Sequence, residues 1–358
     1  MTDKKANKRV GLSAWAARIG LLLGGLLLGF LSYTTISQSI HDARVLNNPP
    51  EASTFYPVGD GRQVHVYPSG SDNPDDIALV FVGCIVCSSE FWQAIQLEAG
   101  EFVQTYAFDQ ANVTWSDPGP PAYPANIAAD LADFLAQIEE EQVILAGFSA
   151  GMLPIFRYMD NPNPDAPEVV ALVSFEGSIL HEDEVLQYAD SSPIGLTDTT
   201  ANLVLQLGIG RLLVPFFQGP LDQSVNVTNR DYYDRVRMTT GTRKALQAWH
   251  EQFSPQMVAD VREMTESIVW PTDVIVYVFD PDNAPEAAFI QQQTAEQIEL
   301  FNQRNSLQEV WYQDWVAAAQ PESRYIVVED SSHSVMLDRP EVILTALDEL
   351  VTLLRERQ

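Results

Sequence analysis

The sequence predicts an α/β protein in which helices pack on both faces of a doubly wound, mostly parallel sheet. Short β-rich runs alternate with helical patterns along most of the chain, and several runs are almost continuously apolar. Segments 78–82 and 274–278 have the uninterrupted apolar character of strands buried on both faces. The runs expected to form strands are Gln63–Tyr67, Ile77–Val82, Val103–Phe108, Gln142–Ala146, Val169–Phe175, Asp273–Phe279 and Arg324–Glu329.

The composition fits a folded, acidic protein and excludes several other classes. Its 358 residues include 20 lysines and arginines against 49 aspartates and glutamates, for a formal net charge of −29. This charge argues against nucleic acid as a partner, because phosphate binding requires a basic surface. With 46% hydrophobic residues the chain is too apolar to be disordered. Its two cysteines close at most one loop, which excludes a disulfide-rich scaffold.

The first forty residues are expected to lie outside the globular fold. An uncharged apolar run extends from Ile19 to Ile36, and a helix of this length spans about 27 Å, close to the hydrocarbon thickness of a bilayer. The run follows four basic residues, Lys4, Lys5, Lys8 and Arg9. We therefore expect residues 1–40 to form a basic N-terminus and a single membrane anchor, which contacts the lipid bilayer through residues 19–36. With the basic end in the cytoplasm, the rest of the chain lies outside it.

A cleaved signal peptide and a buried core helix are the alternative interpretations of this segment. Ser37 and Ser39 offer only a weak cleavage site. Glycine is tolerated better in membrane helices than in soluble ones, and the run contains Gly24, Gly25 and Gly29. These features favour the uncleaved anchor.

The rest of the chain divides into a stalk, a core in two halves and one insertion. We expect residues 41–54 to form the stalk, residues 55–176 the first half of the core and residues 271–358 the second half. The interval 177–270 has helical apolar spacing and no convincing strand, which indicates a helical cap over one edge of the sheet. The alternative is that these helices only cover a face of the sheet.

The segment Gly147–Gly151 predicts a nucleophilic serine. It directly follows the strand pattern 142–146 and precedes a helical stretch, and its central residue is Ser149. Glycines two positions either side of a serine permit a sharp strand-to-helix turn that lifts the hydroxyl clear of the sheet. The start of the following helix also favours developing negative charge.

A serine becomes nucleophilic only when a base accepts its proton, and His333 is the candidate. It follows the last predicted strand directly, so it reaches the same sheet edge as Ser149. The other histidines are given no role: His65 is interpreted as a surface residue of the first strand, His41 lies in the stalk, and His181 and His250 lie in the cap.

A carboxylate is expected to orient the imidazole, and three strand-end residues compete for this role. Asp280 follows the strand 273–279 and is preferred, which gives the chain order Ser149, Asp280, His333. Asp282, two residues later, and Glu176, at the end of the strand 169–175, are the alternatives.

Two backbone N–H groups are expected to stabilise the oxyanion of a tetrahedral intermediate. One belongs to Ala150, directly after the nucleophile, and the other to Cys84, in the turn after the strand 77–82. Cys84 and Cys87 also form a C-x-x-C pair, but a zinc site lacks a second pair of ligands. A redox role, a structural disulfide and free thiols remain open for these cysteines.

Together these segments resemble the α/β-hydrolase superfamily, in its capped, single-domain serine hydrolase form. The similarity covers about residues 55–355 and is carried by residues 82–92, 106–109 with 115–118, 147–151 and 330–341. It implies an eight-stranded sheet, no cofactor or metal, and cleavage of an ester-like bond through an acyl-enzyme. Val82 departs from the histidine usual before the oxyanion glycine. Ser149 differs from the aspartate nucleophile of the family's dehalogenases and epoxide hydrolases.

The expected function is a membrane-anchored, extracytoplasmic serine hydrolase. The apolar cap residues favour a small, uncharged or hydrophobic ester-like substrate. An aminopeptidase and a carbon–carbon bond hydrolase share the same triad within the family. A non-catalytic ligand-binding or scaffold protein on the same fold is the alternative from another class.

Overall fold

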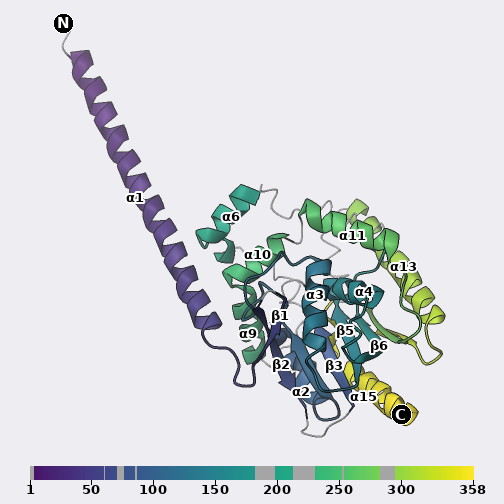
Figure 1. The fold of residues 1–358 in the computed structure, drawn as a ribbon. Coiled ribbons are helices and arrows are strands. Elements are labelled where there is room, and N and C mark those ends of the chain that lie inside the picture. The colour runs from purple at the N-terminus through teal and green to yellow at the C-terminus, as the bar shows by residue number, and fades with distance from the viewer. Residues whose placement is uncertain are drawn as a thin grey trace.

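The computed structural model describes residues 4–59, 61–70, 76–84, 87–181, 198–212, 230–251, 254–282 and 295–358. Its centre is an eight-stranded sheet, which confirms the predicted fold class (Figure 1). The strands are β1 (Thr54–Val58), β2 (Arg62–Ser69), β3 (Ile77–Val82), β4 (Gln104–Phe108), β5 (Gln142–Phe148), β6 (Glu168–Phe175), β7 (Ile275–Pro281) and β8 (Arg324–Val328).

The strand order is β1-β2-β4-β3-β5-β6-β7-β8. The pairs β1–β2 and β2–β4 are antiparallel, and every pair from β4 to β8 is parallel. The seven expected strands match β2 to β8, whereas the residue pattern gave no signal for β1. This strand lies at the sheet edge and contains Pro57, a residue that only an edge strand accommodates easily.

The observed ends of two strands differ from the expected ones in a way that affects the site. β5 continues to Phe148, so Ser149 follows it without an intervening residue. β7 continues to Pro281, and Asp280 pairs in register with Val327 of β8. Asp280 therefore lies inside a strand rather than after one. Glu176, in contrast, directly follows the last residue of β6.

Helices cover both faces of the sheet, and alternate residues of each central strand pack against one face or the other. Val143 and Leu145 of β5 belong to the apolar cluster on one face, and Ile144 and Ala146 to that on the opposite face. The first cluster includes residues of α3 (Pro124–Leu135), α4 (Met152–Asp160), α11 (Pro255–Ser267) and α13 (Ala295–Ala318). The second includes residues of α2 (Gln93–Ala99), α14 (Val335–Asp338) and α15 (Pro340–Arg357).

The described part of the expected cap is helical, but its helices have two different positions. α11 packs on α3 through Met257, Val261 and Met264, so the final part of the interval 177–270 covers a face of the sheet. The remaining helices are α6 (Asp198–Gln206), α9 (Arg230–Thr240) and α10 (Arg243–Glu251). α9 contacts the short helix η1 (Ser89–Trp92), near the carboxyl end of β3. Residues 182–197 and 213–229 of the interval lie outside the described residues.

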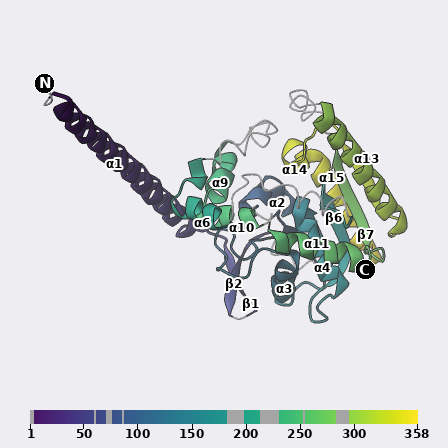
Figure 2. The same ribbon diagram turned by 90° about the horizontal axis from the view of Figure 1, so that it is seen from above.

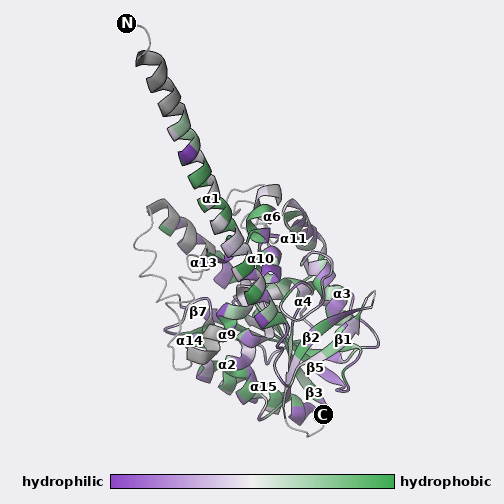
Figure 3. Ribbon diagram, turned by 90° about the vertical axis from the view of Figure 1, so that its left-hand side faces the viewer, coloured by the Kyte–Doolittle hydropathy of each residue, from purple (hydrophilic) through white to green (hydrophobic). Residues whose placement is uncertain are grey.

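The N-terminal helix α1 (Lys4–Leu46) extends far beyond the rest of the molecule (Figures 1 and 2). Among the described helices it is the one long and apolar enough to cross a membrane, and only 6% of its apolar window is buried. Hydrophobic residues recur along the part of this helix that Figure 3 colours by hydropathy. This exposure does not match a buried core helix.

The last turns of α1 pack against the cap helices. Gln38 Nε2 donates to the carbonyl oxygen of Gly241 over 3.0 Å, and Asp42 forms an ion pair with Arg243 at 3.0 Å. Thr34 and Val45 are also buried. The first part of the expected stalk is therefore a packed helix that continues from the apolar run.

Candidate active site

Ser149 occupies a constrained backbone position where β5 ends. It begins the short helix η2 (Ser149–Gly151), and its φ of 52° lies in the left-handed region that residues with a side chain seldom adopt. Its carbonyl oxygen accepts a hydrogen bond from Ser178 N over 2.8 Å, which helps to hold this conformation. A strained serine between a strand and a helix is the geometry of a nucleophile elbow.

The glycines around Ser149 permit contacts that a larger residue would prevent. A Cβ atom on Gly151 would lie 2.4 Å from the carbonyl oxygen of Val82 and 2.7 Å from that of Gly83. A Cβ atom on Gly147 would lie 2.5 Å from Met152 Sδ. The turn after Ser149 thus packs directly against the end of β3, next to the loop expected to form the oxyanion site.

His333 lies in the loop between β8 and α14, beside the turn that contains Ser149. The centroid of its ring is 4.7 Å from that of Phe148, the residue before Ser149. Two carboxylates hold the loop: Asp282 accepts from the amides of Asp330 and Ser331, and Asp338 accepts from Ser332. These hydrogen bonds fix the loop that carries His333 and so position its imidazole beside the turn at Ser149.

The carboxylate that contacts the imidazole is Glu176 and not the preferred Asp280. His333 Nδ1 lies 2.7 Å from Glu176 Oε2, and the Glu176 side chain is only 12% exposed. The backbone of Glu176 has a φ of 40°, and its N–H donates to the carbonyl oxygen of Phe279 over 2.9 Å. His333 thus pairs with Glu176, one of the two alternative carboxylates, and Asp282 instead holds the His333 loop.

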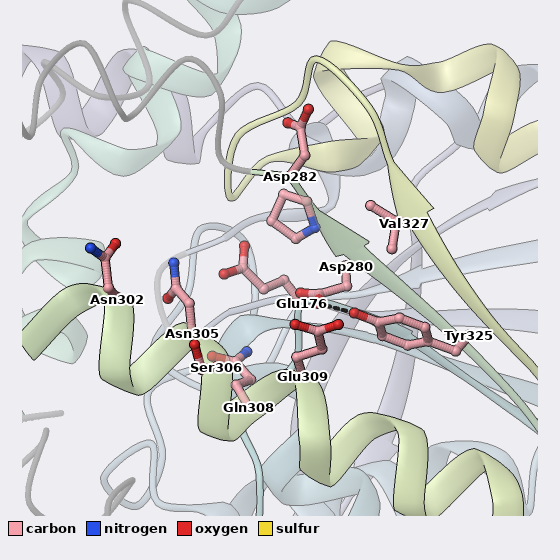
Figure 4. Close-up of a pocket in the computed structure, with 11 residues that line it drawn as sticks. Glu176, Asp280, Asp282, Asn302, Asn305, Ser306, Gln308, Glu309, Tyr325 and Val327 are labelled. Atoms are coloured by element: carbon pink, nitrogen blue, oxygen red, sulfur yellow. Dashed lines mark hydrogen bonds between the residues drawn. The ribbon is translucent and has the colours of Figure 1, made fainter.

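Asp280 has a different partner because it lies within β7. Its Oδ2 accepts a hydrogen bond from Tyr325 OH on the neighbouring β8 over 2.5 Å (Figure 4). Burial raises the pKa of Asp280 to about 7, the Tyr325 hydrogen bond opposes this, and the charges of Glu176 and Glu309 add to it. Burial and the Asp280 carboxylate likewise raise the pKa of Tyr325.

Glu176, Asp280 and Tyr325 line a cavity of about 360 Å³ whose opposite wall is α13 (Figure 4). That wall contributes Asn302, Asn305, Ser306, Gln308 and Glu309. Among the described residues, no group of three or more histidines, cysteines and carboxylates has the arrangement of a metal site. The cavity therefore places polar side chains next to Glu176, the carboxylate that contacts His333.

The two cysteines of the expected oxyanion loop form a disulfide. Cys84 directly follows Gly83, and Cys87 N donates to the carbonyl oxygen of Cys84 over 2.9 Å. A Cβ atom on Gly83 would lie 2.8 Å from the carbonyl oxygen of Cys87, so the two ends of this short segment are in close contact. Of the interpretations left open by the sequence, the structure contains the disulfide.

The interpretation of His65 as a surface residue is wrong, because its side chain is completely buried. Its Nδ1 lies 2.8 Å from Asp109 Oδ2, and its Nε2 lies 2.7 Å from Ser53 Oγ. Asp109 also accepts from the Ser89 backbone N–H over 2.5 Å. This network holds η1, which follows the disulfide loop. Asp109 directly follows β4. This strand-end carboxylate is the sequence signal that could have revealed the network.

The family comparison agrees with this architecture. A model of the alpha/beta hydrolase family matches residues 79–346, which include every residue of the site described above from Val82 to Asp338. A comparison with curated proteins found no match.

Several solved enzymes share the fold. The Cif epoxide hydrolase from Acinetobacter nosocomialis has a TM-score of 0.61 at 12% identity and covers 88% of this chain and 96% of its own. An esterase from Exiguobacterium antarcticum has a TM-score of 0.55 at 15% identity, with coverage of 84% and 99%. Est816, an N-acyl homoserine lactone degrading enzyme, has a TM-score of 0.51 at 14% identity, with coverage of 82% and 98%. At such identities the likeness concerns the fold alone.

Proposed function

The chain belongs to the alpha/beta hydrolase family, and on that premise we propose that it is a serine hydrolase that cleaves an ester-like bond through an acyl-enzyme. The observation that carries this proposal is the 2.7 Å contact of His333 Nδ1 with Glu176, beside the strained turn that begins at Ser149. We assign Ser149 as nucleophile, His333 as general base and Glu176 as the acid.

In the proposed acylation step, Nδ1–H of His333 donates to Glu176, which leaves a lone pair on Nε2. Nε2 takes the proton of Ser149 Oγ, and Oγ attacks the carbonyl carbon of the substrate. The carbonyl electrons move to its oxygen, where the N–H groups of Ala150 and Cys84 stabilise the charge. Collapse of this intermediate expels the alcohol, which receives the proton from Nε2.

Deacylation repeats these steps with water. His333 Nε2 removes a proton from the water as its oxygen attacks the acyl carbon, and the proton then returns to Ser149 Oγ as the acid product leaves. Glu176 stabilises the imidazolium in both halves of the reaction without accepting the proton itself. No step needs a metal or a cofactor.

We also propose that α1 anchors the enzyme in a membrane, with the hydrolase part outside the cytoplasm. The apolar run 19–36, the basic residues before it and the low burial of the helix support this arrangement. A small, uncharged or hydrophobic ester is the proposed substrate class. Ser149 supports ester chemistry over the aspartate-dependent chemistry of epoxide hydrolases.

A fluorophosphonate probe tests the assignment on the full chain, because residues 34–46 pack against the cap and cannot be removed without disturbing it. We expect covalent labelling of the wild type, none of Ser149→Ala and strongly reduced labelling of His333→Ala. Ser267→Ala, on an exposed serine of α11, is the matched control and should label normally. If the folded wild type is not labelled, a non-catalytic ligand-binding protein becomes the better description.

A labelled enzyme should then be tested on acyl esters of increasing chain length and on amide and carbon–carbon bond substrates. Preferential turnover of neutral esters supports the proposed class, and faster cleavage of a peptide N-terminus would favour an aminopeptidase. Resistance of the full chain to alkaline carbonate extraction tests the anchor. Protease accessibility of the hydrolase part in sealed vesicles tests its orientation.

A further inference from the structure

A second cavity lies at the base of α1, far along the chain from the catalytic residues. Its volume is about 390 Å³. One wall is a single stripe of α1, at positions 33, 36, 37, 40, 41 and 44, and the other is formed by Arg211, which follows α6. Thr35 Oγ1 donates to the carbonyl oxygen of Leu207 over 3.2 Å, so the segment after α6 is attached to α1 beside this cavity.

The cavity concentrates positive charge in a strongly acidic protein. Arg44 and Arg211 both line it, and in the described part of the chain neither forms an ion pair with a carboxylate. Arg211 instead contacts Ser37 Oγ. The nearby carboxylate of Asp42 is already paired with Arg243 at 3.0 Å. Two guanidinium groups are therefore available to an anionic ligand that both of them contact.

The remaining lining is apolar and exposed. Tyr33 is 68% exposed, and Ile36 and Ile40 are each 60% exposed. Two further apolar side chains are exposed outside this lining: Leu203 of α6 and Leu212, which follows Arg211 in the chain. A ligand that fits this lining has a long apolar part as well as a negative charge.

The position of the cavity along α1 places its positive charge and its apolar lining at the same depth relative to the proposed bilayer. Trp15 and Tyr33 are separated by about 27 Å along the helix, close to the hydrocarbon thickness, and such aromatic residues prefer membrane interfaces. Tyr33 and Ile36 then lie at the end of the hydrocarbon layer, and Ser37 with Arg211 lies just beyond it. Side chains of a helix lean toward its N-terminus, which directs Arg44 back toward the same level.

We propose that this cavity binds an anionic phospholipid, whose phosphate contacts Arg44 and Arg211 and whose acyl chains lie along Tyr33, Ile36 and Ile40. The site rests on the proposed membrane anchor. A bound lipid would connect α1 to the segment after α6 and so fix the cap relative to the bilayer surface.

Native mass spectrometry of the full chain in detergent tests the site by titration with phosphatidylglycerol, phosphatidylcholine and inorganic phosphate. We expect wild type to bind phosphatidylglycerol most tightly, and Arg44→Gln and Arg211→Gln each to weaken this binding about tenfold, as expected for one charge-assisted contact. Arg262→Gln removes the same charge from an exposed position on α11 and should bind like wild type. Thermal unfolding checks that all variants remain folded.

Equal binding of phosphatidylglycerol to wild type and both cavity variants would overturn the lipid site. So would inorganic phosphate that binds as tightly as the lipid and is lost in the same variants, because the ligand would then be a free anion. Carbonate extraction distinguishes failure of the lipid site from failure of the anchor. If the chain resists extraction but shows no arginine-dependent lipid binding, the anchor is supported and the lipid site is contradicted. Extraction of the chain would contradict both the anchor and the lipid site. Fluorophosphonate labelling tests the hydrolase assignment independently of both.

Discussion

Nδ1 of His333 lies 2.7 Å from Oε2 of Glu176, so the imidazole is oriented from the end of β6 rather than from β7. The two strands are neighbours, and the N–H of Glu176 donates to the carbonyl oxygen of Phe279, the residue before Asp280. Two carboxylates are thus held close together with different partners. Glu176 contacts the candidate base, and Asp280 contacts Tyr325.

Substitution of each carboxylate by its amide separates the two roles. We expect Glu176→Gln to lower kcat for ester hydrolysis by about 10⁴-fold, because an amide cannot stabilise the imidazolium or hold its tautomer. Asp280→Asn should stay within about tenfold of wild type, since an amide oxygen still accepts from Tyr325. Steady-state kinetics on the full chain measures both. A larger loss of kcat in Asp280→Asn than in Glu176→Gln would instead assign the acid role to Asp280.

Asp280 should make the stability of the protein depend on pH. Burial raises its pKa from the ordinary 3.8 to about 7 in the folded protein, so between these values the folded state holds a proton that the unfolded state has released. Stability from this group is therefore greatest below about pH 4, falls as the pH rises toward 7, and then levels off. Asp280→Asn removes the dependence.

Thermal unfolding of wild type and Asp280→Asn at pH 5 and pH 8 measures this contribution. We expect the variant to gain about 2 kcal/mol relative to wild type between the two pH values, a modest figure because the carboxylate is partly exposed. Glu176→Gln serves as the comparison. It removes a neighbouring negative charge that raises the pKa of Asp280, so this pKa should be lower in the variant. Parallel pH profiles for wild type and Asp280→Asn would contradict a raised pKa.

Gly151→Ala should impair both stability and catalysis. Its new Cβ would lie 2.4 Å from the carbonyl oxygen of Val82, which forces the turn after Ser149 away from β3. We expect a destabilisation of about 1–3 kcal/mol, as for other overpacked sites, together with slower fluorophosphonate labelling. Gly25→Ala is the matched control because nothing lies within 4 Å of its Cβ position. Normal labelling of a folded Gly151→Ala protein would show that this close contact does not matter for the site.

Reduction of the Cys84–Cys87 disulfide should slow hydrolysis. The bond closes the loop whose Cys84 N–H is the proposed oxyanion donor, and loss of one such donor costs about 10²- to 10³-fold in kcat. Because the N–H remains and is only less well positioned, we expect a decrease of about tenfold with a dithiol reductant. The double variant Cys84→Ser, Cys87→Ser should have this lower activity with or without reductant. Mass spectrometry verifies that the disulfide has been reduced. If kcat is then unchanged, the disulfide does not contribute to hydrolysis.

Local patterns were enough to single out Ser149 and His333 as candidate site residues, because each follows an apolar strand pattern and lies in a short motif. The carboxylate that contacts His333 could not be predicted in this way. Its identity depends on where β7 ends and on the left-handed backbone of Glu176, and both are set by contacts between strands. Similarly, Trp115 contributes to the burial of His65: its ring packs against the imidazole, 4.8 Å between centroids, from a loop fifty residues later. Side-chain alternation within a single strand carries no information about such a contact.

The Cys84–Cys87 bond also has a consequence for when the enzyme becomes active. A chain newly made in a reducing cytosol carries two thiols at these positions, since disulfides form in oxidising compartments. With the proposed topology, the bond forms only after the hydrolase part has crossed the membrane. Its loop would therefore reach its final shape only after translocation, and esters inside the cell that makes the protein would meet a less active form.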